Sequence, residues 1–435
     1  MKKKARQDIL QAPRGMRDFF GKDFAKRKKF FTQAERIAEH YGFSGIETPI
    51  MEHTEIFLKG VGEGTDIVDK EMYNLETAGG DKLTLRPEGT AAVMRAYIEH
   101  GMRSLPQPIL WYYEGAFFRH EKPQKGRYRQ LYQFGLEIMG TKNPAYDALI
   151  IQVGYEILKQ SGKNIIVGIN SIGNTEERTQ YIRTLKAFYQ KHRDALGESD
   201  QKRIETNPLR ILDSKDVSTK KVNENAPELL NSLEMESRVF FDDVLDYLDV
   251  LSIPYEVVPT LVRGLDYYEH TVFEFVTLDE QGNKSHALGG GGRYDGLAET
   301  LGHNKAIPSV GLGLGVDRII EEMDDDDTTD DKLRVSLIAM GKEAEAGALV
   351  LMAKIPKESI HCIPSFSQQK LGKQLEKAEK MQCDYAIILG EDEMQNNEGI
   401  IKNLHTREQE TISLQTIPEK LKEKTSLFLK EKNMS

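Results

Sequence analysis

The sequence predicts an α+β unit built on a large antiparallel sheet, followed by a smaller C-terminal α/β unit. Apolar runs typical of strands dominate the chain up to about residue 320, with few helical patterns between them. Eight of the twelve residues at 321–332 are then acidic, and such a segment repels itself and does not pack. Beyond it, short apolar runs alternate with helical spacing, which is typical of a mostly parallel sheet covered by helices.

The elements of the first unit follow from the spacing of its apolar residues. Phe30, Ala34, Ile37 and Tyr41 recur at helical spacing, which predicts a helix that Gly42 can end. A helix-rich, charged stretch without motifs, at about residues 172–254, is expected to be an insertion. Strands are predicted at residues 111–115, 131–139, 271–276 and 287–292.

The second unit shows the alternation of strands and helices directly. Apolar runs at 335–340, 360–364 and 385–389 predict strands, and residues 371–381 predict a helix between the last two. A calcium loop is the alternative reading of the acidic segment, but it lacks the required glycine and the closing glutamate. We therefore expect a core at 1–323, an acidic linker at 324–332 and an α/β domain at 333–435.

Composition limits the classes of protein to consider. The chain has 435 residues, 39% of them hydrophobic, which is enough for a real core. The net charge of −10 argues against coating nucleic acid through bulk charge but leaves room for a local basic patch. No apolar run is long enough for a membrane span, and the basic start lacks the apolar region of a secretory signal. With only two cysteines, Cys362 and Cys383, we expect a cytoplasmic protein without a disulfide framework.

Common nucleotide and metal templates do not fit the glycine-rich and histidine-containing segments. No Gly-Lys pair is followed by Ser or Thr, which excludes a P-loop. Val316 stands where a dinucleotide fingerprint needs its third glycine. His120 and Glu121 begin like a zinc-protease motif, but Gln124 replaces the second histidine ligand. A nucleotide would therefore have to bind in another architecture.

Residues 118–133 predict a β-hairpin with a basic tip. Pro123 and Gly126 favour the turn, and the cations of the tip are interleaved with Tyr128 and Tyr132. Aromatic rings among cations suit base stacking combined with phosphate pairing, although an exposed polar hairpin is the plainer interpretation. The cations are Lys122, Lys125, Arg127 and Arg129.

Two further segments have a similar chemical character. In residues 262–268, Arg263 lies among apolar residues and tyrosines, where a structural ion pair is the alternative to a ligand contact. Residues 288–295 and 309–318 are rich in glycine, which lets a ligand lie on bare backbone, and Arg318 is expected at the start of a helix. Glycine runs also occur in turns and bulges, but together the three segments predict a polyphosphate pocket.

The order of these motifs resembles the class II aminoacyl-tRNA synthetases. Residues 42–49, 118–127 and 311–318 resemble motifs 1, 2 and 3 of that class. The segments at 12–18, 85–90, 119–129, 263–268 and 289–295 are similar to histidyl-tRNA synthetases, and the likeness covers nearly the whole chain. It implies an α+β catalytic domain with a large antiparallel sheet and a C-terminal α/β anticodon-binding domain.

The resemblance implies a two-step reaction with ATP. The carboxylate of histidine attacks the α-phosphate, and a ribose hydroxyl of tRNA(His) then takes the histidyl group. The implied catalytic residues are Arg263 and Arg119, the latter at the α-phosphate, because arginine stays charged and pairs bidentately with phosphate. Magnesium should accompany ATP with ligands the sequence does not identify, and no prosthetic group is implied. The implied ATP-binding residues are Arg119, Glu121, Arg127, Leu131 and Arg318.

The resemblance also implies a histidine pocket. Glu137 and Tyr268 should meet the imidazole, whose two nitrogens need one donor and one acceptor, and Glu88, Thr90 and Gln133 the α-amino group. The full implied histidine set is Glu88, Gly89, Thr90, Arg119, Gln133, Glu137, Arg263, Tyr267 and Tyr268. The acceptor end of tRNA should meet Gln124, Lys125 and Arg129.

Two positions depart from the family pattern. Leu131 stands where class II enzymes usually place a phenylalanine against adenine, and Arg407 stands where relatives tend to have glycine. The family also implies a homodimer with Pro49 at the subunit boundary and tRNA recognition by residues 333–435. The alternative is a histidine-sensing paralogue that serves as a subunit of an ATP phosphoribosyltransferase, but such paralogues tend to lose the catalytic cations and the C-terminal domain.

Overall fold

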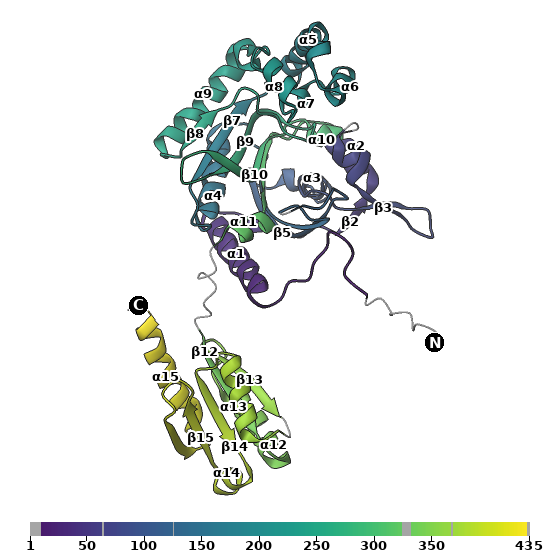
Figure 1. Cartoon of the computed structure of the whole chain (residues 1–435). Helices are drawn as coiled ribbons and strands as arrows, with labels where there is room; N and C mark the ends of the chain where they lie inside the picture. The colour runs from purple at the N-terminus through teal and green to yellow at the C-terminus, as the bar shows by residue number, and fades with distance from the viewer. Residues whose placement is uncertain (1–9, 63–64, 125, 324–331, 367–368, 433–435) are drawn as a thin grey trace, which may run out of the picture. The chain divides into compact units, whose positions relative to one another are not determined.

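Two units make up the chain (Figure 1). Each has its own main sheet and its own apolar core. The computed structural model describes residues 10–62, 65–124, 126–323, 332–366 and 369–432. Within these ranges, no helix has the length and apolar character needed to cross a membrane. The units divide between Asp327 and Thr328, inside the segment expected as an acidic linker, of which 324–331 lie outside the described residues. The acidic run nevertheless starts within helix α11 (Val316–Glu322).

An eight-stranded sheet organises the first unit, in the order β1-β5-β6-β11-β10-β9-β7-β8. The six central strands pair antiparallel, which confirms the predicted antiparallel sheet, while the edge strands β1 and β8 pair parallel. The strands β5 and β6 are joined by the predicted hairpin and stay in register along their whole length. The bounds are β1 (Ser44–Gly45), β5 (Ile109–Phe118), β6 (Gln130–Met139), β7 (Ile165–Ser171), β8 (Tyr255–Val257), β9 (Glu269–Leu278), β10 (Lys284–Arg293) and β11 (Ser309–Gly315).

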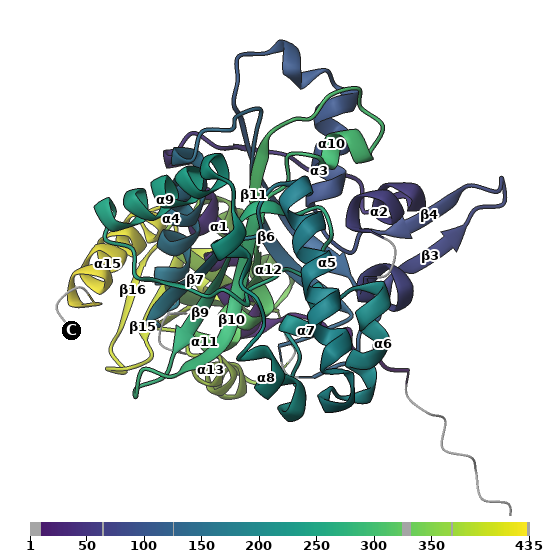
Figure 2. The same cartoon turned by 90° about the horizontal axis from the view of Figure 1, so that it is seen from above.

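Helices α1 (Gly21–His40), α4 (Ala145–Lys159), α9 (Met235–Val250) and α11 cover one face of this sheet (Figure 2). Phe30 and Ala34 of the predicted apolar stripe are buried in this core. The helix ends at His40, and Gly42 follows two residues later with a φ of +85°, which favours glycine, as expected. The predicted first helix is therefore confirmed.

The opposite face carries a second apolar cluster, which includes helices of the expected insertion. Its members come from α3 (Thr90–Glu99), α5 (Thr175–Lys191), α6 (Glu198–Thr206) and α7 (Leu209–Leu212), together with side chains of β5 and β9. Figure 2 shows α5 to α8 gathered beside the sheet. The other elements on this side are α2 (Thr54–Val61), α8 (Val217–Asn223), α10 (Leu297–Thr300) and the small sheet of β2 (Met51–His53), β3 (Tyr73–Glu76) and β4 (Lys82–Leu85).

Helix α9 differs from the expectation for residues 172–254. Phe241, Val244 and Leu248 pack in the core of the large sheet, against the same face as α1 and α4. The charged residues between these apolar positions made the segment look like part of the insertion. The helices before α9 form the separate layer, whereas α9 belongs to the layer of α1 and α4.

The second unit is a five-stranded sheet in the order β13-β12-β14-β15-β16, with helices on both faces. The strands β12, β13 and β14 are parallel as predicted, whereas β15 and β16 are antiparallel and were not predicted. Their half-exposed, largely polar residues give no apolar run. The bounds are β12 (Leu333–Ala339), α12 (Lys342–Lys354), β13 (Ile360–Phe366), α13 (Leu371–Lys380), β14 (Tyr385–Leu389), α14 (Glu391–Asn396), β15 (Glu398–Asn403), β16 (Gln409–Ser413) and α15 (Ile417–Lys432).

The turn between β15 and β16 explains why glycine suits position 407. Arg407 adopts a φ of +68°, in the left-handed region that glycine enters without steric cost. Its guanidinium forms an exposed ion pair with Glu379 of α13.

Candidate active site

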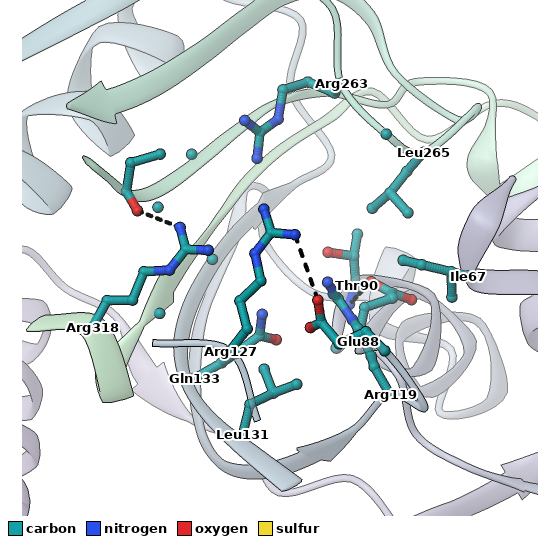
Figure 3. A pocket seen from close by; sticks show the side chains of 18 of the residues that line it. Ile67, Glu88, Thr90, Arg119, Arg127, Leu131, Gln133, Arg263, Leu265 and Arg318 are labelled. Carbon is teal, nitrogen blue, oxygen red and sulfur yellow. Dashed lines mark hydrogen bonds and ion pairs between the residues drawn. The ribbon is translucent and has the colours of Figure 1, made fainter. Parts of the chain in front are cut away.

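A cavity of about 440 Å³ lies against β5, β6, β10 and β11 and brings together the three segments singled out in the sequence. Basic side chains gather at one end (Figure 3). The carboxyl group of Glu88 and the phenol groups of Tyr267 and Tyr268 line the other end. The predicted residues that line it are Glu88, Gly89, Thr90, Arg119, Glu121, Arg127, Leu131, Gln133, Arg263, Tyr267, Tyr268 and Arg318.

At the first end, arginines from three parts of the chain line the cavity (Figure 3): two from the loop between β5 and β6, one from the loop before β9 and one from α11. Arg119 follows β5, and its Nε donates to the carbonyl of Pro87 at 2.8 Å. Arg318 stands in the first turn of α11, as predicted, and donates to the carbonyls of Gly126 (3.1 Å) and Ala287 (2.8 Å). These bonds fix the guanidinium groups and leave further donors directed at the cavity.

The other two arginines of this end have carboxylate partners. Arg127 lies 3.7 Å from Glu121, and Arg263 lies 3.1 Å from Glu274. The structural ion pair weighed for Arg263 therefore exists, in a side chain that also lines the cavity. Burial lowers the pKa of Arg318, and the neighbouring charge of Arg127 lowers it further. A polyanion between these cations would relieve their repulsion.

Glycines of β10 and β11 leave parts of the cavity wall without side chains. A Cβ on Gly290 would lie 2.4 Å from the carbonyl oxygen of Phe273 and 3.0 Å from the guanidinium of Arg263. A Cβ on Gly311 would lie 1.7 Å from the carboxylate of Glu137. The glycine-rich motifs are thus needed where strands and functional side chains approach most closely.

The second end of the cavity is closed and hydrogen-bonded. Glu88 precedes α3, and its carboxylate accepts the backbone N–H groups of Thr90 (2.7 Å) and Ala91 (2.9 Å). Burial raises the pKa of Glu88, an effect that these hydrogen bonds and the charge of Arg119 oppose. Tyr267 donates to the same carboxylate at 3.4 Å. This end therefore offers a fixed carboxylate to a ligand.

Glu137 differs from the expectation, because it lies behind the cavity and does not line it. Its side chain is 0% exposed. Its carboxylate accepts hydrogen bonds from the hydroxyls of Thr90 (2.7 Å), Tyr113 (3.4 Å) and Tyr294. Burial raises the pKa of Glu137 to about 8, against the opposing effect of these bonds. Thr90 and Tyr113, which do line the cavity, lie between it and Glu137.

Tyr113, Tyr294 and Glu274 were missed by the sequence analysis. Tyr294 stands two positions after the last of the four glycines, behind Arg293, so the motif contained it without indicating its role. The ring of Tyr113 occupies space left open by Gly89 and Gly135, where an added Cβ would lie within 2.3 Å and 2.1 Å of it. Glu274 lies within the predicted strand β9, and nothing in its local sequence marks it as the partner of Arg263.

The hairpin tip is held mainly by the protein itself. Arg129 donates to the carbonyls of Glu121 and Arg14 at 3.4 Å and does not line the cavity. Gln124 pairs through its backbone with Arg127 and also lies outside the cavity lining, and Lys125 lies outside the described residues.

The rings expected to stack on a ligand have internal cation partners. The guanidinium of Arg17 lies 4.1 Å from the ring centre of Tyr128, and that of Arg27 lies 4.1 Å from the ring centre of Tyr132. Both rings still line the cavity. The N-terminal segment thereby supports the hairpin.

Comparisons with known proteins agree with this geometry. The family model "Histidyl-tRNA synthetase" matches residues 15–319, and the model "Anticodon binding domain" matches residues 334–424. A histidine–tRNA ligase of Listeria monocytogenes is 41% identical over 417 residues, which cover 95% of this chain and 98% of the relative. One from Thermus thermophilus is 41% identical over 414 residues, covering 94% and 97%.

Solved structures give the same result. The crystal structure of apo S. aureus histidyl-tRNA synthetase superposes with a TM-score of 0.76 at 32% identity, covering 94% of this chain and 99% of that one. An ATP phosphoribosyltransferase regulatory subunit/histidyl-tRNA synthetase from Bacillus halodurans has a TM-score of 0.60 at 18% identity, covering 89% and 100%, and it shares the fold. From the matches of family model and sequence, the chain belongs to the histidyl-tRNA synthetase family.

Proposed function

We propose that this protein is a histidine–tRNA ligase, which activates L-histidine with ATP to histidyl-adenylate and transfers the histidyl group to tRNA(His). The observation that carries the proposal is one cavity with a closed carboxyl and phenol end and an open end of four arginines. An amino acid and a polyphosphate placed at these two ends would meet within it. The family membership of the chain agrees with this reading.

In the first step, a carboxylate oxygen of histidine attacks the α-phosphorus of ATP, and pyrophosphate leaves. Arg119 would hold the α-phosphate, and Arg127 and Arg318 would hold the γ-phosphate. Arg263 would lie beside the reacting carboxylate and the α-phosphate, where negative charge develops. Fixed cations accelerate such a step because they are already oriented before the charge forms.

Magnesium would enter with ATP. No cluster of three or more acidic, histidine or cysteine side chains suited to a metal occurs in the described parts of the chain. Mg²⁺ needs only one or two carboxylates when phosphate oxygens supply further ligands. Glu121 and Glu274 are suitable ligands for the ion, because both carboxylates line the cavity. Both also lie close enough to Arg318 for their negative charges to raise its pKa. The ion would neutralise phosphate charge there.

Histidine would bind at the closed end. Glu88, Thr90 and Gln133 would hold the α-amino group, and Tyr268, Glu137 and its hydroxyl partners would recognise the imidazole. A ligand without the ring nitrogens would leave buried polar groups unpaired, which costs about 1–3 kcal/mol for each group. Leu131 would cover the adenine with an aliphatic side chain.

In the second step, a ribose hydroxyl of the tRNA would take the histidyl group from the adenylate, and AMP would leave. Residues 333–435 would recognise it, with the lysines of α13 as candidate phosphate contacts, although Lys380 already pairs with Glu376 at 2.7 Å. Gln124 and Lys125 remain proposed contacts for the acceptor end, while the internal bonds of Arg129 favour a supporting role. A homodimer in the cytoplasm completes the proposal, with Pro49 at the subunit boundary.

Two assays test this function. Histidine-dependent exchange between ATP and pyrophosphate measures activation, and charging of purified tRNA(His) measures transfer. Deleting the chain after Lys332 should leave exchange intact and reduce charging, because the second unit has its own core. Histidine binding without any exchange would instead favour the regulatory paralogue.

A further inference from the structure

Two arginines from the helical insertion hold the loop that carries Arg263. Arg178 of α5 donates from one nitrogen to the carbonyl oxygens of Asp266 (2.8 Å) and Tyr268 (2.5 Å). These two acceptors flank Tyr267 in the loop. Because one guanidinium nitrogen serves both carbonyl oxygens, the two acceptors are held close together around it.

Arg210 of α7 bonds to the same loop from another side. It donates to the carbonyl of Gly264 at 3.4 Å, and it forms an ion pair with Asp66 at 2.6 Å. Arg210 and Asp66 line the cavity, as do Gly264 and Ile67, the residue after Asp66. Arg210 therefore joins two walls of the cavity.

The loop is also bonded to α2. The N–H of Asp266 donates to the carbonyl of Val61 at the end of α2 (3.1 Å). The carboxylate of Asp266 packs against Gly62, where an added Cβ would lie 2.7 Å from it. The loop thus sits between α2 on one side and the insertion on the other, and the insertion supplies the two charged donors.

We propose that Arg178 and Arg210 are positioning residues for histidine activation, so that the helical insertion sets the place of Arg263, Tyr267 and Tyr268. The inference rests on the proposed function, because the loop matters only if Arg263 acts on the reacting groups. The alternative is that both arginines only stabilise the fold. A stabilising role would not select among the kinetic constants, whereas a positioning role would.

The first test compares Arg178→Met with Arg183→Met. Arg183 is an exposed arginine on the same helix, so it controls for loss of charge in α5. We expect Arg178→Met to lower kcat of histidine-dependent exchange by about ten- to a hundredfold, the effect of misplacing a reacting group by about 1 Å. The KM for ATP should stay within about twofold, because Arg119, Arg127 and Arg318 come from other elements. Arg178→Lys should recover part of the loss, and Arg183→Met should match the unmodified protein.

A double-mutant cycle then separates positioning from stability. If Arg178 acts through the placement of Arg263, Arg178→Met should cost much less in an Arg263→His background than alone. Arg210→Met and Asp66→Asn should each lower kcat, and their effects should not add, because the two residues form one ion pair. If Arg178→Met does not fold, these two variants test the proposal in its place.

An unchanged kcat in folded Arg178→Met or Arg210→Met would overturn the proposal. So would an equal loss in the two Arg263 backgrounds. Failure of the proposed function would look different, because the unmodified protein would then show no histidine-dependent exchange.

Discussion

The two ends of the cavity are built on different physical principles. At the closed end, Glu137 is 0% exposed and Glu88 is 4% exposed, and both carboxyl groups are bonded to neighbouring donors. At the open end, the side chains of Arg263 and Arg127 are 21% and 41% exposed. The closed end can select a ligand by its hydrogen-bond pattern, and the open end can attract one by its charge.

Because of this difference, we expect the closed end to determine which amino acid binds and the open end to determine how fast it reacts. A ligand at the closed end must replace existing internal bonds, so a poorly matched ligand leaves buried groups unpaired. A polyphosphate at the open end needs only to reach cations that are already oriented. Substitutions at the two ends should therefore change different kinetic constants.

The largest effect is expected for Arg263→His at the open end. The smaller ring cannot place a fixed positive charge where Arg263 does, so kcat of exchange should fall by about a thousandfold. Binding of histidine and ATP should change little, because the benefit of the charge arises mainly in the transition state. A rise in KM alone, measured by steady-state exchange, would contradict this role.

Glu137→Gln should act at the closed end and mainly on histidine. The amide of glutamine cannot reproduce every hydrogen bond of the carboxyl group, and a buried polar group left unpaired costs about 1–3 kcal/mol, which corresponds to about a five- to hundredfold weaker affinity. Because the pKa of Glu137 is raised to about 8, the empty site holds the protonated acid at pH 7, and glutamine resembles that form. The variant should therefore fold normally, and calorimetry should find ATP affinity preserved. Equal losses for both ligands would place Glu137 outside the histidine site.

Leu131→Phe should strengthen the binding of ATP at the open end of the cavity. Leu131 lines the cavity at the position proposed to cover adenine. An aromatic contact adds about 0.5–1.5 kcal/mol, so the KM for ATP should fall by a few-fold while the KM for histidine stays constant. A change in the KM for histidine instead would mean that Leu131 faces the amino acid.

The smallest effect is expected in the pH dependence of the thermal stability of the protein without ligands. Between the ordinary pKa of 4.5 and the raised pKa of about 8, the folded form binds more protons at Glu137 than the unfolded form. The stability that Glu137 contributes is therefore complete below the lower value and is lost as the pH rises through the upper one. Relative to Glu137→Gln, the Tm of the unmodified protein should fall by a few degrees as the pH rises from about 6 to 9. A constant difference in Tm, measured by calorimetry, would contradict the raised pKa.

Local patterns predicted much of this fold and the convergence of the arginines. The stripe that includes Phe30 and Ala34 predicted α1, and turn-forming residues between two apolar runs predicted the hairpin of β5 and β6. The partners of Glu137 were not predictable in this way. Tyr113 reaches it because Gly89 and Gly135, which are far apart in the chain, both leave room for its ring. Such a fit depends on strand register and on tertiary contacts that a local pattern does not encode.

The amino-acid selectivity of ATP–pyrophosphate exchange tests the central claim most directly. The full chain should be assayed with histidine and, separately, with each of the other amino acids at equal concentration. The closed end predicts exchange with histidine at least about a hundredfold faster than with any other amino acid, because a ligand that mismatches several buried groups loses several kcal/mol. Comparable exchange with a second amino acid, or exchange without any amino acid, would contradict the account.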